Sequence, residues 1–177
     1  MAILGGLIGI AVCAWAVWIY NRLVRDRHRV AAAWSDIEVQ LKRRHDLLPK
    51  LIEAVRGYAA YEQATLEAVT ELRTRSRQTA DPAQRGRLEA ELGAGMQRLL
   101  ALAEAYPELK AGANFLALQG DISEVENAIQ HARRYYNGAV RNLNTRIDSF
   151  PDLLLARPLG YRYAPYFQLE EEGRHGR

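Results

Sequence analysis

Cysteine is almost absent from this chain, since Cys13 is the only one among 177 residues. A lone thiol cannot form an intramolecular disulfide, and it cannot supply the paired thiolates of a zinc-type site. The chain also lacks a Gly-rich phosphate loop, a GxSxG elbow and an HExxH helix. We therefore predict that the protein is not an enzyme and that it uses no metal, cofactor or small-molecule substrate.

Histidine is also scarce, and its spacing is wrong for a di-iron bundle. Such centres need Glu-x-x-His pairs from two helices. Only Glu172 and His175 have this spacing, and they lie near the C-terminus. We interpret His28, His131 and His175 as solvated side chains and expect no metal site.

Charged side chains are missing from the first 21 residues, and Ile3 to Tyr20 is an apolar run of 18 residues. As a helix this run would be about 27 Å long, close to the thickness of the hydrocarbon core of a bilayer. Trp15 and Trp18 lie in its second half, and amphipathic rings favour the headgroup layer. We therefore predict a transmembrane anchor over residues 1–21.

A collar of arginines follows this anchor at once. Four arginines against Asp26 account for the whole formal net charge of +3. Because the excess charge is confined to the collar, we predict no binding to nucleic acid. Arginines are retained on the cytoplasmic side, so we predict a single-pass protein with its N-terminus outside and its body in the cytoplasm. The expected contacts with the lipid surface are Trp15, Trp18, Arg22, Arg25, Arg27 and Arg29.

Other interpretations of the N-terminal segment stay open. A cleaved secretory peptide would need basic residues before the apolar run, which this chain lacks. Acylation of Cys13 would also need such a cation, and Val12 fits that site poorly. Gly5 and Gly9 could let two anchors approach closely, although small residues are common in membrane helices.

Beyond the collar, apolar residues recur every seven positions in three stretches. We predict helices over about residues 22–77, 82–105 and 113–149, with Asp81 capping the second helix and Pro82 in its first turn. No stretch has the alternation of a strand. The sequence therefore predicts an all-α fold, in which the anchor continues into an antiparallel bundle over residues 22–150.

The predicted helices differ in length, about 85 Å for the first and about 36 Å for the second. The second cannot cover the apolar stripe of the first, which begins at Val30 and Trp34. That stripe would meet another subunit or the C-terminal segment, or the first helix would break near Pro49 and make a fourth helix. We predict a homo-oligomer, since so much apolar surface is costly to leave in water.

A polar cluster surrounds Pro49, which lacks the N–H that would donate to the carbonyl of His45. We expect a kink or break there, with Lys42, Arg43 or Arg44 donating to the freed carbonyl. A structural role is favoured over catalysis or ligand binding for His45. The candidate packing or partner contacts in this region are Trp34, Arg43, Arg44, His45, Asp46 and Pro49.

The helical pattern ends at Pro151. Residues 151–167 are too apolar for a free tail, and we predict that they pack, whereas the polar residues after them are predicted to be disordered.

Several blocks of the chain resemble the LemA family of membrane-anchored bacterial proteins. They are YNRLVRDRHRVAAAWSDIEVQLKRRHDLLPKLIEAVRGY, then YPELKAGANFLALQGDISEVEN, AIQHARRYYNGAVRNLNTRIDSFP and PYFQLEEE, in the family's order. The resemblance implies a helical bundle with a cytoplasmic body at the bacterial inner membrane. It carries over no catalytic residues. Glu126 and Asn127, at polar positions of the family pattern, join the candidate packing or partner contacts.

This chain also has Val125 and Ala128 where the family pattern has Thr and Arg. If those polar residues serve a shared site, this chain lacks part of it.

These observations lead to two hypotheses of function. The first is a membrane-anchored, non-enzymatic scaffold or adaptor that acts through oligomerisation or through contacts with an unidentified protein partner. The alternative is a membrane-shaping or compartment-organising protein that binds lipid through the collar and the aromatic C-terminal segment.

Overall fold

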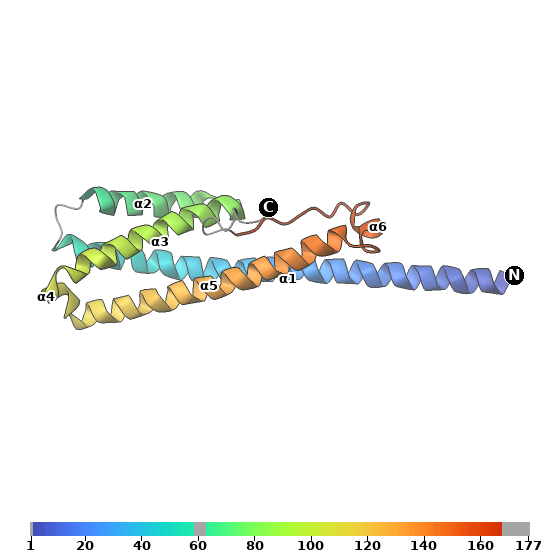
Figure 1. Ribbon diagram of the computed structural model, residues 1–177, viewed down its shortest axis with the longest axis horizontal. Coiled ribbons are helices and arrows are strands. Elements are labelled where there is room, and N and C mark those ends of the chain that lie inside the picture. Colours follow the sequence, from blue (N-terminus) through green and yellow to red (C-terminus); the bar gives the residue numbers. More distant parts are fainter. Residues whose placement is uncertain (1, 59–62, 168–177) are drawn as a thin grey trace, which may run out of the picture. The chain divides into compact units, whose positions relative to one another are not determined.

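The computed structural model describes residues 2–58 and 63–167, and regular structure in these ranges is entirely helical (Figure 1). The all-α prediction is confirmed. The predicted disordered tail lies outside the described residues. The helices are α1 (Ala2–Arg56), α2 (Gln63–Gln78), α3 (Pro82–Glu104), α4 (Pro107–Lys110), α5 (Ala113–Asp148) and α6 (Leu153–Ala156).

The first long helix differs from its prediction. It was expected to be continuous over residues 22–77 or to break near Pro49 and make a fourth helix; that further helix, α2, is present, but α1 does not break at Pro49. α1 runs through Pro49, ends at Arg56 and is followed by α2 from Gln63. Gly57 follows the last helical residue, and the backbone N–H of Tyr58 closes the final turn onto the carbonyl of Val55 at 3.0 Å. Glycine is a poor helix former, so the chain leaves the helix there and not at the proline.

Two compact units divide the chain. Unit 1 comprises Met1–Asp36 and Arg134–Pro165, and unit 2 comprises Ile37–Arg133 and Tyr166–Arg177. α1 and α5 each contribute residues to both units.

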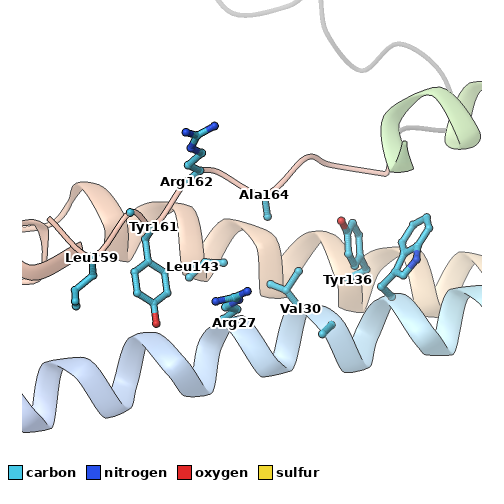
Figure 2. Close-up of a pocket in the computed structure, with 11 residues that line it drawn as sticks. Arg27, Val30, Tyr136, Leu143, Leu159, Tyr161, Arg162 and Ala164 are labelled. Atoms are coloured by element: carbon cyan, nitrogen blue, oxygen red, sulfur yellow. The ribbon is translucent and has the colours of Figure 1, made fainter. Parts of the chain in front are cut away.

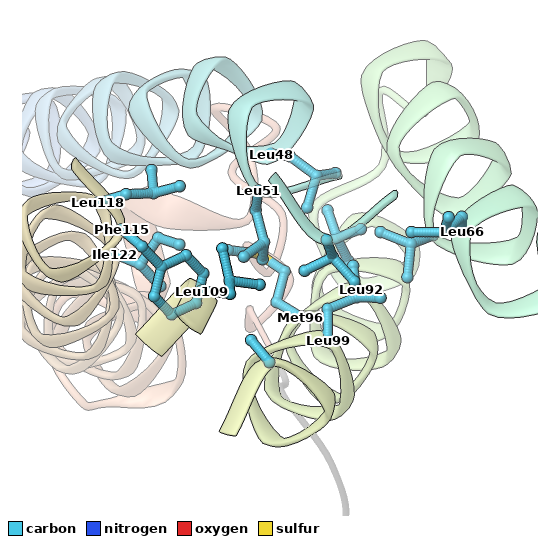
Figure 3. Packing of buried hydrophobic residues seen from close by; sticks show 13 residues of the cluster. Leu48, Leu51, Leu66, Leu92, Met96, Leu99, Leu109, Phe115, Leu118 and Ile122 are labelled. Carbon is cyan, nitrogen blue, oxygen red and sulfur yellow. The ribbon is translucent and has the colours of Figure 1, made fainter. Parts of the chain in front are cut away.

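Unit 2 has an apolar core to which α1, α2, α3 and α5 all contribute (Figure 3). Leu48 and Leu51 of α1, Leu92 of α3 and Ile122 of α5 are at most 1% exposed. Gly95 on α3 permits a close approach to α2, because a Cβ atom there would lie 2.6 Å from Cγ2 of Val69. The seven-residue apolar pattern thus ends up inside the bundle, as expected for such a seam.

The start of α3 is capped as predicted. The side chain of Asp81 accepts a hydrogen bond from the backbone N–H of Gln84 at 2.7 Å, and Pro82 occupies the first turn. A proline is favourable there because that turn has no intrahelical acceptor for its N–H.

Unit 1 contains the apolar N-terminal part of α1. Among the described residues, α1 is the helix that is long and apolar enough to cross a membrane, and only 6% of its most apolar stretch is buried. Ile3 is 83% exposed and Leu7 is 61% exposed. A core helix of a soluble protein would be covered, so this exposure agrees with a lipid-facing segment.

The segment after α6 packs along α5 within unit 1. The side-chain amide of Asn144 donates to the carbonyl of Ala164 at 3.0 Å and accepts from its backbone N–H at 2.9 Å. The hydroxyl of Tyr136 donates to the carbonyl of Pro165 at 2.8 Å. These bonds satisfy backbone groups that an irregular segment would otherwise leave unpaired.

Candidate functional site

The most unusual polar feature of unit 2 is a fully buried carboxylate, that of Glu89 on α3. It interacts with side chains from two other helices. From α1, Nη1 of Arg44 donates to Oε2 at 2.9 Å, and Nε2 of His45 lies 2.8 Å from Oε1. From α2, the hydroxyl of Ser76 donates to Oε1.

Arg44 extends this cluster to α5. Its Nε and Nη2 donate to the two carboxylate oxygens of Glu126, both at 2.7 Å, and Nη1 also donates to the backbone carbonyl of Glu89 at 2.9 Å. Gly93 makes room for this guanidinium, because a Cβ atom there would lie 2.6 Å from Nη2. Four helices therefore meet at one set of residues, the Glu89 cluster, which consists of Arg44, His45, Ser76, Glu89 and Glu126.

The cluster holds Glu89 in its ionised form. Burial alone would raise the pKa of this carboxyl, but the hydrogen bond and charge of His45, the charge of Arg44 and the Ser76 hydroxyl outweigh it and lower the pKa below its usual 4.5. A buried charge is tolerated only when it is paired and hydrogen-bonded in this way.

Ser76, His45 and Glu89 have the residue types of a hydrolytic triad, but their arrangement is different. The serine hydroxyl donates to the carboxylate, whereas in a triad it would donate to the histidine. Ser76 and Glu89 are also completely buried. This geometry suits a cross-link between helices and offers no exposed nucleophile. Among the described residues, no group of three or more His, Cys, Asp or Glu side chains could hold a metal ion.

The carbonyl freed by Pro49 is satisfied by a residue that the sequence prediction missed. Nε of Arg73 on α2 donates to the carbonyl of His45 at 3.0 Å. The predicted donors Lys42, Arg43 and Arg44 are therefore wrong. The reason is tertiary, because α2 folds back beside α1 and brings Arg73 to this carbonyl.

The structure brings together only some of the predicted contacts. Arg44, His45 and Glu126 meet in the cluster, whereas Asp46, Pro49 and Asn127 are exposed. Arg43 is also exposed and pairs with Glu124 at 3.1 Å. In unit 1, Trp34 packs against Tyr136 with ring centroids 5.4 Å apart.

Glu89 and Ser76 were missed, although a signal for both exists in the sequence. Glu89 precedes the buried Met96 by seven residues, and Ser76 follows the buried Val69 by seven. Both therefore continue an apolar register. Polar residues in such a register mark buried partners, but the register does not say which residues pair.

The stripe that begins at Val30 is covered by the chain itself. Ile37 and Leu41 are fully buried, and Val30 packs against a cluster that includes Leu143 and Tyr161. Burial of this stripe therefore does not require a second subunit.

At the end of the apolar run, the guanidinium of Arg22 lies over the ring of Trp18 at 4.4 Å. Trp15, Arg25, Arg27 and Arg29 are exposed. The stacked pair places a cation and an indole at one level of α1, as is typical of a membrane interface.

A groove of about 490 Å³ lies in unit 1 between α1, α5 and the segment after α6 (Figure 2). Its walls include Val30, Leu143 and Leu159. Figure 2 shows Tyr161 pointing toward α1 and Arg162 pointing away from it. Burial and nearby Tyr20 raise the pKa of Tyr161, against the opposing charge of Arg27, so its hydroxyl stays protonated at neutral pH. The lining of the groove is mainly apolar, and Arg27 and Tyr161 are among its polar side chains.

The lowered pKa of Glu89 predicts how stability depends on pH. Since the folded pKa lies below the unfolded value near 4.5, the stabilisation is fully present above that value and is lost as pH falls through the folded pKa. We expect the unfolding free energy of the full-length protein in detergent to fall below about pH 4.5, and to fall less in Glu89→Gln. Denaturation curves across this range test this, with Glu91→Gln, an exposed neighbour, as control. Equal slopes for wild type and Glu89→Gln would contradict it.

These features define a class of protein, the all-α proteins with an apolar N-terminal extension. The apolar N-terminal helix continues into a helical bundle, and a buried polar cluster connects the helices of that bundle. The sequence model of the LemA family matches residues 33–176, and the chain belongs to that family. It is 30% identical to Protein LemA of Metamycoplasma hominis over 152 residues, which are 85% of this chain and 69% of the relative.

The chain is also similar to magnetosome proteins. It is 25% identical to Magnetosome protein MamQ 2 of Paramagnetospirillum magneticum, over 93% of this chain and 70% of the relative. It is 23% identical to Magnetosome protein MamQ of Magnetospirillum gryphiswaldense, over 87% of this chain and 66% of the relative.

Proposed function

We propose that this LemA-family chain is a membrane-anchored, non-enzymatic scaffold or adaptor at the cytoplasmic face of the bacterial inner membrane. It acts by oligomerising or by holding other proteins at the membrane. The observation that carries the proposal is the continuity of α1, in which an exposed apolar stretch and the buried residues Arg44, His45 and Leu51 belong to one helix. Such a helix joins the apolar stretch to the bundle without a flexible linker.

The chemistry of the Glu89 cluster supports a holding role. Its charged side chains form ion pairs with one another, and the cluster joins four helices. The arginine collar supports the orientation, because cations next to an apolar span are retained in the cytoplasm.

A second candidate is favoured by the relatives that are named magnetosome proteins. In this alternative the chain shapes or organises a membrane compartment by binding lipid with the collar Arg22, Arg25, Arg27 and Arg29. Each arginine near an anionic surface would contribute about 1 kcal/mol of attraction.

Topology is tested with single cysteines. In a Cys13→Ser background, Ala80→Cys lies in the exposed link between α2 and α3. We expect it to resist an impermeant thiol reagent in intact cells and to react after lysis. Ready labelling in intact cells would overturn the cytoplasmic orientation.

The scaffold role is tested by cross-linking the full-length chain in its native membrane, followed by mass spectrometry. We expect adducts with a second copy or with a specific protein partner, and we expect them to disappear when residues 2–20 are deleted. If only uncross-linked monomer is recovered, the scaffold role is wrong. Reconstitution into vesicles then tests the alternative, which requires the protein to change vesicle diameter.

A further inference from the structure

The end of α5 returns to the level of α1 at which the apolar run ends. Within unit 1 the two helices are antiparallel, since Trp34 packs on Tyr136 and Arg146 pairs with Asp26. Continuing this register at about 1.5 Å per residue places Asp148, the last residue of α5, opposite about residue 23 of α1. The apolar contacts agree, because Ile19 and Leu23 are buried in one cluster with Ile147 and Ala156.

The chain turns at this level through residues 149–159, which we name the α5–α6 corner. Figure 1 shows α6 just beyond the end of α5. The corner exposes large apolar side chains, with Phe150 77% exposed and Leu154 51% exposed. On α1 at the same level, Trp18 is 54% exposed and Tyr20 is 48% exposed. Apolar groups that gather beside a membrane-spanning run indicate contact with lipid.

The carboxylates at the level of the corner all have partners, so they do not oppose contact with lipid. Asp152 accepts from Nη1 of Arg146 at 3.0 Å, and Asp26 accepts from Nε of the same side chain. Asp148 accepts from the hydroxyl of Tyr163. The carboxylates at this level are therefore neutralised or hydrogen-bonded, while Arg157 is exposed and could meet lipid phosphates.

Several backbone groups of the corner are paired with one another. The N–H of Leu153 donates to the carbonyl of Ser149 at 2.8 Å, and the N–H of Leu154 donates to that of Pro151 at 3.1 Å. The N–H of Ala156 donates to the carbonyl of Asp152 at 2.9 Å. Unpaired backbone groups are the main obstacle to placing irregular chain near hydrocarbon, and these turns reduce their number.

We propose that the α5–α6 corner inserts Phe150 and Leu154 into the boundary between headgroups and acyl chains of the bilayer that α1 crosses. The inference rests on the proposed membrane anchoring and deepens it, because it gives the body a second contact with one leaflet. α1 alone would leave unit 1 free to tilt in any direction relative to the bilayer. A second contact beside it sets which face of unit 1 meets the membrane.

Cysteine labelling of the full-length chain tests this proposal, because Cys13→Ser removes the only native thiol. An environment-sensitive fluorophore is attached to Phe150→Cys, Leu154→Cys or Tyr135→Cys in vesicles of phosphatidylcholine and phosphatidylglycerol. Tyr135 is a matched control, since it is 60% exposed on α5 in the same unit and lies roughly 20 Å along the helix from its end. Ile8→Cys reports the anchor. Helical circular dichroism confirms that each variant is folded.

We expect blue-shifted emission at positions 150 and 154 and several-fold stronger quenching by nitroxide-labelled lipids than at position 135. If positions 150, 154 and 135 are all aqueous while position 8 is in lipid, the insertion is wrong and the anchoring stands. Equal quenching at position 135 would also overturn the insertion, because lipid contact would not be confined to the corner. A label at position 8 that remains in water would overturn both proposals.

Discussion

Replacing Glu89 with alanine is expected to lower the free energy of unfolding by about 3–5 kcal/mol, because the change leaves the buried charge of Arg44 and the buried ring of His45 without their shared carboxylate. Ser76 loses its acceptor as well. The large cost reflects buried groups left with fewer partners, because the His45 ring and the Ser76 hydroxyl lose their carboxylate, and Arg44, whose side chain is 3% exposed, keeps Glu126 alone as its carboxylate partner.

Chemical denaturation of the full-length protein in detergent, followed by helical circular dichroism, measures this change. Glu91→Ala on the same helix is the control, because Glu91 is exposed and a surface substitution is expected to stay within about 0.5 kcal/mol. A loss below about 1 kcal/mol for Glu89→Ala would show that the Glu89 cluster is not a cross-link between the helices.

The Glu89 cluster also affects which helices pair and in which register. An apolar core of Leu residues tolerates sliding of one helix past another, whereas two bonds from Arg44 to Glu126 and two to Glu89 define a register. We hypothesise that Glu89 secures the pairing of the four helices. If a Glu89→Leu variant with Arg44→Met and His45→Phe kept wild-type cross-links between engineered cysteines of α1 and α5, this hypothesis would fail.

Replacing Arg146 with alanine is expected to destabilise unit 1 by about 2–3 kcal/mol. Arg146 forms ion pairs with both Asp26 and Asp152, whose side chains are only 5% and 10% exposed. Burial alone would lower the pKa of Arg146, but the hydrogen bonds and charges of Asp26 and Asp152 together raise it, so the guanidinium stays charged. The expected cost is smaller than for Glu89 because the Arg146 side chain is itself 18% exposed and solvent screens the pair.

Limited proteolysis within residues 157–160 measures this change, since these exposed residues follow α6. Arg141→Ala is the matched control, because it removes an exposed arginine from the same helix. Cleavage should accelerate in Arg146→Ala and not in Arg141→Ala. Arg146→Lys should restore only part of the protection, because a single ammonium does not provide the fork that spans two carboxylates. Equal cleavage rates for both alanine variants would contradict the role of Arg146.

The helical class and the ends of several helices follow from local rules. Seven-residue apolar spacing places Leu48, Leu51 and Ile122 on buried faces, and Asp81 with Pro82 starts α3. Such features depend on residues a few positions apart, so they can be predicted from the sequence. The apolar run and the arginine collar are equally local.

The pairing of polar groups is not local. Pro49 was expected to kink or break the first long helix, but the return of α2 supplies Arg73 to the freed carbonyl, and α1 continues to Arg56. His45 and Glu89 are 44 residues apart, and Arg44 and Glu126 are 82 apart. A sequence states which residues are charged but not which opposite charge will be folded against them.

The amino-acid sequence by itself determined the family, the all-α class and the position of the apolar run, because each depends on residue types at short spacing. Only the tertiary structure decided where the first helix ends, which carboxylate holds Arg44, and which apolar side chains stay uncovered beside the anchor. The physical reason is that burial and ion pairing are properties of three-dimensional neighbours, and Glu89 or Phe150 acquires its role only from what packs around it.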